Sequence, residues 1–231
     1  MLLDAAVPET LPPSPGASGF DRAIRVLWPI AAVVLAVSWL YIGHRQGGTK
    51  LDWWGVKLVD SIGHRDRSGA GIASDLRSLG SPTITFVGLL VIAAVTSTQR
   101  RLAIPAVVLC SAAGFAALLN DLYLQKHATR VVAWPLIWNG VDHFPSGHSV
   151  GASALAFTTV GLCRLAGMRG VRFAVVTACA IGVAAMVAWA NVATYAHMPT
   201  SAAAGPLVSL ACVGAAYDVV SRLASRRPRR P

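Results

Sequence analysis

The chain has 231 residues, of which 55% are hydrophobic and 13% are charged, and its mean hydropathy is +0.57. Soluble domains are richer in charge, and the long apolar runs exclude a disordered chain, a collagen-like repeat and a disulfide scaffold. The composition therefore indicates a bundle of membrane helices. The net charge of +10 would suggest nucleic acid in a soluble protein, but basic residues of a membrane protein first fix its orientation, so no nucleic-acid partner is expected.

The apolar runs predict six membrane-spanning helices, since one span needs roughly 17 to 25 mostly apolar residues. We therefore expect an all-α polytopic membrane protein. Residues 51–59 crowd apolar side chains, including Trp53 and Trp54, between charged ones. They predict an interfacial helix between the first two spans, where a tryptophan ring keeps its N–H hydrated, and a packing helix buried between spans is the alternative. The spans are expected at residues 23–43, 82–97, 102–123, 149–163, 173–190 and 201–220.

The distribution of basic residues indicates the orientation. Six spans put both termini on one side, and the short connections on that side carry basic residues such as Arg100 and Arg101, whereas most basic residues of the other side lie in one long loop. Orientation is set mainly by short loops, so we expect both termini to be cytoplasmic. We expect the membrane to be the plasma membrane.

This topology predicts three parts of the chain. They are a disordered cytoplasmic leader at residues 1–20, a six-helix membrane domain at 21–220 and a basic cytoplasmic tail at 221–231. The sequence carries no feature that specifies an oligomeric state.

Polar residues gather in two connections, 120–148 and 191–201, which this topology places together on the extracytoplasmic face. In the first, a Pro-Ser-Gly-His tetrapeptide that ends at His148 directly precedes a span, so it marks the start of a helix. The unpaired N–H groups and partial positive charge of a helix start allow Ser146, Gly147 and His148 to hold a phosphate. The alternative is that Ser146 only caps the helix and His148 is an interfacial residue.

His197 lies in the second connection, just before the last span. A lone histidine near a membrane interface more often anchors or hydrogen-bonds than reacts. Here a second histidine, His148, starts a helix on the same face. Two histidines can divide the roles of nucleophile and general acid around one phosphoryl group.

These motifs and their order resemble those of the type 2 phosphatidic acid phosphatases, six-span lipid phosphatases related to the vanadium haloperoxidases. The family has a Lys and then Arg-Pro after its third span, Pro-Ser-Gly-His at the fourth, and Ser-Arg, five residues, His, three residues and Asp before the sixth. In this chain the middle motif is complete, and the last region runs from Asn191 through five residues to His197 and through three more to Ser201. Residues 76–85 are similar to the family's lead-in to its second span, so the resemblance covers about residues 40–220.

The resemblance implies a membrane phosphatase for a lipid phosphate or diphosphate of the extracytoplasmic leaflet, with the bilayer and the lipid as its partners. In this mechanism His197 Nε2 attacks phosphorus to give a phosphohistidine, His148 protonates the leaving lipid alkoxide, and water hydrolyses the intermediate. Lys126, Ser146 and Gly147 would hold the phosphoryl oxygens. No metal and no cofactor are implied.

Three positions depart from the family pattern. Ser201 stands where the family has the Asp that orients the nucleophilic histidine, and Asn191 stands where it has a phosphate-binding Arg. Ala133 replaces the Arg of the first motif, and Arg130 is the candidate to reach the same anion from a shifted position. The alternative to an active enzyme is therefore a catalytically impaired relative that binds a lipid phosphate or a partner protein without hydrolysis.

Asp142 and Asp121 are candidates to replace the missing carboxylate. We expect both to be solvated or helix-end residues instead, and His143 to lie on the loop surface. A metal site built from Asp142, His143, His148 and His197 is a weaker interpretation, because a phosphate-binding helix start already accounts for the tetrapeptide.

Overall fold

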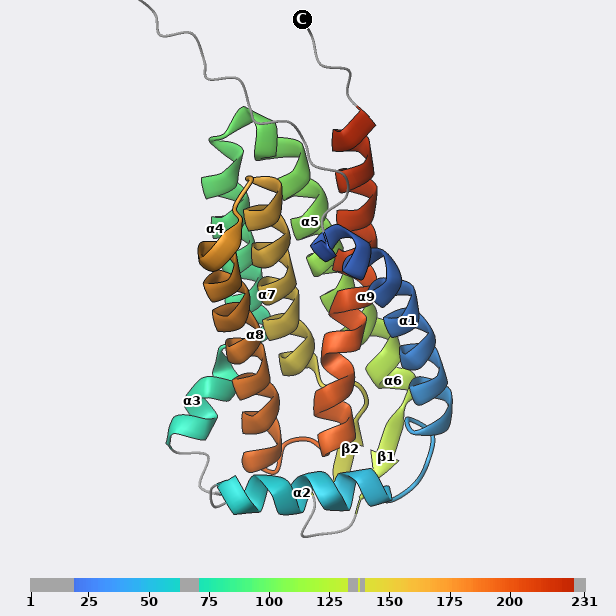
Figure 1. Cartoon of the computed structure of the whole chain (residues 1–231). Coiled ribbons are helices and arrows are strands. Elements are labelled where there is room, and N and C mark those ends of the chain that lie inside the picture. The colour runs from blue at the N-terminus through green and yellow to red at the C-terminus, as the bar shows by residue number, and fades with distance from the viewer. Residues whose placement is uncertain (1–18, 63–70, 133–136, 138–139, 227–231) are drawn as a thin grey trace, which may run out of the picture.

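Helices dominate the chain over the residues that the structure, a computed structural model, describes: 19–62, 71–132, 137 and 140–226 (Figure 1). The predicted all-α class is therefore confirmed, with one small two-stranded antiparallel sheet added to it. The elements in chain order are α1 (Gly19–Tyr41), α2 (Lys50–Ile62), α3 (Ile72–Ser78), α4 (Pro82–Ser97), α5 (Arg100–Leu119), the π-helix η1 (Asn120–Leu124), α6 (Gln125–His127), β1 (Thr129–Val131), β2 (Val141–His143), α7 (Gly147–Leu165), α8 (Gly170–Ala193) and α9 (Pro199–Arg226).

Each predicted span coincides with a helix, but not every helix is apolar enough to be recognised as a span. Among the described residues, four helices are long and apolar enough to cross a membrane: α1, the continuous stretch Arg100–His127, α8 and α9. Helices α3 and α4 qualify together, bent by 53° at their junction, which makes up to five. The protein is thus a multi-pass membrane protein, and the count of six remains a prediction.

The helix missing from that set is α7, and its position in the bundle explains its lower hydropathy. It contacts α4, α5, α8 and α9, and most of its residues are buried. A helix enclosed by other helices gains more from small residues that allow close contact than from large lipid-facing ones. A Cβ on Gly151, for example, would lie only 2.6 Å from the carbonyl oxygen of Gly80.

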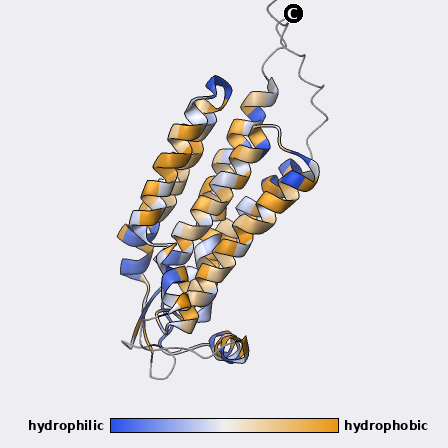
Figure 2. Ribbon diagram, turned by 90° about the vertical axis from the view of Figure 1, so that its left-hand side faces the viewer, coloured by the Kyte–Doolittle hydropathy of each residue, from blue (hydrophilic) through white to orange (hydrophobic). Residues whose placement is uncertain are grey.

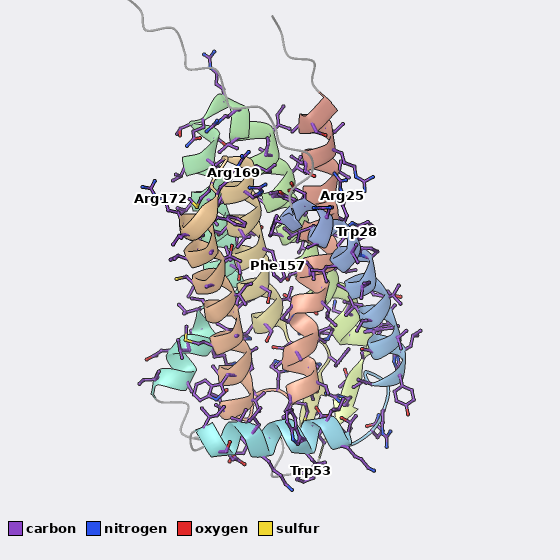
Figure 3. The ribbon with its side chains drawn as sticks, in the orientation of Figure 1. Arg25, Trp28, Trp53, Phe157, Arg169 and Arg172 are labelled. Carbon is purple, nitrogen blue, oxygen red and sulfur yellow. The ribbon has the colours of Figure 1, made fainter. Side chains whose placement is uncertain are left out.

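The two ends of the bundle differ in character. Hydrophobic residues follow the length of the helices and hydrophilic residues gather at the ends (Figure 2). Helix α1 begins and α9 ends at one end, whereas α2, β1 and β2 lie at the other (Figure 1). Arg25, Arg169 and Arg172 lie at the end away from α2, and Trp53 projects from α2 itself (Figure 3). We call these the arginine end and the α2 end.

Helix α2 lies across its end of the bundle and is amphipathic (Figure 1). Val56 and Val59 are buried in a cluster with Met198, which immediately precedes α9. Trp53 and Trp54, by contrast, are 47% and 65% exposed. One face of the helix therefore packs on the bundle, and contact of its exposed tryptophans with a membrane interface remains a prediction.

The predicted leader and tail fall mostly outside the described residues. Residues 1–18 and 227–231 are not described, and Gly19 and Phe20, the last two of the expected leader, already belong to α1. Helix α9 continues through the first part of the expected tail to Arg226.

Candidate active site

The turn that ends α8 positions His197 at the α2 end. The backbone N–H groups of Ala196 and His197 both donate to the carbonyl oxygen of Asn191, at 3.0 and 3.1 Å. The Asn191 side chain donates from Nδ2 to Ser149 Oγ at 3.1 Å and to the Val187 carbonyl at 2.9 Å. Asn191 therefore connects the end of α8 to the first turn of α7. Although it aligns with the family's phosphate-binding Arg, Asn191 stabilises the turn that follows α8.

Asp142 is the carboxylate that faces His197, and the expectation that it is solvated is wrong. Asp142 Oδ1 lies 3.1 Å from His197 Nδ1 and accepts the backbone N–H of Met198 at 3.3 Å. The residue is fully buried, because the β1–β2 hairpin places Asp142 opposite Arg130 and folds inward. With Nδ1 held by the carboxylate, His197 Nε2 is the nitrogen left for a substrate.

Ser201 supports this carboxylate and does not replace it. Its hydroxyl donates to Asp142 Oδ2 at 2.6 Å. Burial by itself would raise the pKa of Asp142, but the hydrogen bond from His197, the charge of Arg130 and the Ser201 hydroxyl more than compensate and hold the pKa below its ordinary value. The site thus keeps a negative charge beside the imidazole.

The lowered pKa of Asp142 predicts an acid-sensitive contribution to stability. Its stabilising effect is fully present above the unfolded-state pKa of about 3.9 and is lost as the pH falls through the lower folded-state pKa. As the pH falls below about 4, the melting temperature of the protein in detergent should fall more steeply than that of Asp142→Asn. The exposed Asp60→Asn should keep the wild-type slope, and equal slopes for all three proteins would contradict the assignment.

Arg130 lies under Asp142, and this corrects the expectation that it binds the phosphate. It is fully buried, and its nitrogens already have acceptors. Nε donates to Asp142 Oδ2 at 3.0 Å, Nη1 to Asp52 Oδ2 at 3.3 Å, and Nη2 to Ser201 Oγ at 2.8 Å, to Thr200 Oγ1 at 3.1 Å and also to Asp142. Arg130 thus bridges two carboxylates and orients the one that faces His197.

Asp52 brings α2 into the same network. Its Oδ1 accepts the backbone N–H and the hydroxyl of Thr200 at 2.9 and 2.7 Å, and its Oδ2 accepts the N–H and hydroxyl of Thr49, both at 2.9 Å. Thr49 and Asp52 form a reciprocal cap at the start of α2, because Thr49 Oγ1 accepts the Asp52 N–H at 3.2 Å. The fully buried Asp52 therefore fastens α2 to the first turn of α9.

The start of α7 offers a hydroxyl without a partner. Ser146 is the N-cap residue, but its side chain makes no capping hydrogen bond, so the alternative that it only caps the helix is wrong. Its backbone N–H donates to the Ser201 carbonyl at 3.0 Å, while its buried Oγ has no hydrogen-bond partner in the described part of the chain. A buried hydroxyl of this kind is able to hydrogen-bond to a polar ligand.

Gly147 lets two polar side chains lie close to the start of α7. A Cβ there would lie 3.1 Å from Asp121 Oδ1 and 3.3 Å from Gln125 Nε2, so a larger residue would push these groups outward. The side chain of Gln125 donates to the Pro145 carbonyl at 2.7 Å, which holds this loop against α6.

His148 is half-buried in the first turn of α7, and His197 and Arg77 both act on its imidazole electrostatically. The two predicted histidines therefore lie in one neighbourhood at the α2 end. The unpartnered hydroxyl of Ser146 stands two residues before His148, at the helix start.

Among the described contacts, none joins the other predicted residues to the network around Asp142. Lys126 is exposed in α6, and none of the hydrogen bonds described for the site reaches it. Asp121 is half-buried and accepts from Asn120 Nδ2 at 3.1 Å. His143 is exposed, as expected. Within the described ranges, no three His, Cys, Asp or Glu side chains are placed to hold a metal ion.

Sequence reasoning missed two residues of this neighbourhood, Asp52 and Arg77. The Thr49–Asp52 spacing signals a helix start, but it does not indicate that the carboxylate reaches the site. Arg77 lies inside the segment 76–85, whose resemblance to a family lead-in was a usable signal.

Comparisons with known proteins show which family and which fold the chain resembles. Residues 121–225, which contain both histidines, match the PAP2 superfamily. The structure is similar to the crystal structure of the first transmembrane PAP2 type phosphatidylglycerolphosphate phosphatase from Bacillus subtilis, with a TM-score of 0.58 and 18% sequence identity. The similarity covers 91% of this chain and 98% of the other, and at this identity it establishes the fold. No curated protein sequence matches the chain significantly.

Proposed function

Because residues 121–225 match the PAP2 superfamily, we propose that the chain is a membrane lipid phosphatase that hydrolyses a lipid phosphate or diphosphate through a phosphohistidine. One observation carries the proposal: Asp142 holds Nδ1 of the buried His197, and His197 lies near His148 at the start of α7, where the Ser146 hydroxyl has no partner among the described residues. The pair of Asp142 and His197 favours an active enzyme over a silent relative, since Asp142 supplies the charge that Ser201 lacks.

The proposed reaction has two steps. The lone pair of His197 Nε2 forms the N–P bond while the bond from phosphorus to the lipid oxygen breaks, and His148 gives its proton to the departing alkoxide. Water then forms a new O–P bond, the N–P bond breaks, and His148 takes up the proton. Asp142 holds the Nδ1 proton of His197 throughout and stabilises the cationic ring.

A groove on the side of the bundle supports a lipid as the substrate. It has a volume of about 410 Å³ and an apolar lining from α7, α8 and Leu79. Ala152, which lines it, follows His148 by one helical turn, so both belong to one face of α7. A lipid whose phosphate is held at His148 would thus place its hydrocarbon chain along this groove. A soluble phosphate ester has no chain to fill the groove.

The proposed orientation places the arginine end in the cytoplasm. Arg25, Arg169 and Arg172 gather there (Figure 3), and short basic segments remain on the cytoplasmic side. The site at the α2 end would then act on the extracytoplasmic leaflet of the plasma membrane.

Phosphate release from the purified protein in mixed micelles tests the function. Phosphatidic acid, phosphatidylglycerol phosphate and undecaprenyl diphosphate are the lipids to compare, with p-nitrophenyl phosphate as the soluble ester. We expect release from at least one lipid, at least 10-fold faster than from the soluble ester, and background rates from His148→Ala and His197→Ala. The exposed Arg172→Ala at the arginine end should retain full activity.

Two outcomes would contradict the proposal. Turnover that survives both histidine substitutions would remove the phosphohistidine mechanism. Binding of a lipid phosphate to wild-type protein without any release would indicate the catalytically impaired relative.

A further inference from the structure

Neither position at which the family has a phosphate-binding Arg supplies a free guanidinium among the described residues. Asn191 replaces one of these arginines and holds the α8 turn, and Arg130, the candidate to replace the other, is bound between two carboxylates. Lys126 is exposed, and none of the hydrogen bonds described for the site holds it in place. A phosphoryl group nevertheless develops negative charge that needs preorganised positive donors. Another basic residue should therefore face the start of α7.

The junction of α3 and α4 lies directly on that helix start. A Cβ on Gly80 would lie 2.1 Å from the carbonyl oxygen of His148, so the two backbones touch. The Gly80 N–H donates to the carbonyl of Arg77 at 3.1 Å, which fixes Arg77 one turn from this contact. Helix α3 also packs against α8, which leads to the His197 turn.

The Arg77 side chain has an unused donor on this side. Its Nε is buried and, within the described ranges, has no hydrogen-bond partner. Its charge acts on His148. A buried guanidinium nitrogen without an acceptor is costly, so a position of this kind normally has a ligand or functional reason.

We propose that Arg77 binds the phosphoryl group of the substrate and supplies the positive charge that the family has at the position of Asn191. This inference rests on the proposed lipid phosphatase activity. Within the described part of the chain, two buried donors near His148, Arg77 Nε and Ser146 Oγ, lack partners, and one oxyanion would satisfy both. In this proposal the positive charge comes from Arg77 in α3, whereas the family's Arg stands at the position of Asn191 in α8.

Two measurements on Arg77→Met test the assignment: binding of inorganic orthophosphate by calorimetry, and kcat/KM for the lipid phosphate that the wild type hydrolyses best. Loss of one charge-assisted contact should weaken orthophosphate binding by about 10- to 100-fold and lower kcat/KM at least as much. Arg77→Lys should recover part of the affinity as a point charge, and the exposed Arg172→Met should match the wild type in both assays. The melting temperature of Arg77→Met reports whether the variant is folded.

The orthophosphate-binding measurement tests the role of Arg77 independently of the proposed phosphatase activity. If the wild type binds orthophosphate and Arg77→Met does not, the assignment of Arg77 holds even if no lipid is hydrolysed. Equal affinity of folded Arg77→Met and wild type, or no orthophosphate binding by the wild type, would overturn it.

Discussion

Replacement of Asp142 by asparagine is expected to lower kcat for lipid phosphate hydrolysis by about 10⁴-fold, the cost of the corresponding Asp-to-Asn change in a serine protease triad. Asp142 Oδ1 lies 3.1 Å from His197 Nδ1, and its other oxygen accepts from Ser201 and Arg130. A neutral amide at this position cannot stabilise a cationic imidazole. It can also donate to Nδ1 and so favour the tautomer in which Nε2 carries the proton and cannot attack phosphorus.

The kcat of purified Asp142→Asn in mixed micelles measures this effect, and a double variant separates positioning from general damage. Because Asp142 acts through His197, adding Asp142→Asn to His197→Ala should cause no further loss. Asp60→Asn, an exposed carboxylate on α2, should leave kcat unchanged. An Asp142→Asn enzyme within 10-fold of the wild type would show that the carboxylate does not assist the histidine.

The sequence predicted the helices well because their signals are local. Helix α4 begins and ends where the apolar run 82–97 does, since Pro82 occupies its first turn and the hydroxyl of Ser81 accepts from the Ile84 N–H at 3.4 Å. The Pro-Ser-Gly-His tetrapeptide likewise marks the start of α7, because a helix start carries its own residue preferences.

The network of Asp52, Arg130, Asp142 and His197 could not be predicted, because its contacts join residues far apart in the sequence. Asp142 reaches His197 from 55 residues away through strands of three residues each, too short to leave a periodic pattern. Asp52 stands among exposed residues of an amphipathic helix, where a carboxylate ordinarily faces water. Its burial depends on Arg130, 78 residues later, and no local preference records such a pairing.

Arg130 is expected to dominate the stability of the α2 end. Asp52 and Asp142 are both fully buried, and both accept from its guanidinium. Arg130→Met leaves two buried carboxylates without their shared cation, and removal of one partner from a buried ion pair typically costs about 3–5 kcal/mol. The free energy of unfolding in mixed micelles titrated with sodium dodecyl sulfate measures this loss.

A surface substitution and a double variant show whether the loss of unfolding free energy in Arg130→Met comes from the buried ion pairs. Arg172→Met removes an exposed arginine at the arginine end and should change stability by no more than about 0.5 kcal/mol. Asp52→Asn combined with Arg130→Met should be more stable than the sum of the single losses predicts, because the double variant no longer buries an unpaired charge at position 52. Additive losses would mean that the two side chains stabilise the fold independently. In that case α2 would be held to the bundle by Val56, Val59 and the Thr200 hydrogen bonds, and not by the buried arginine.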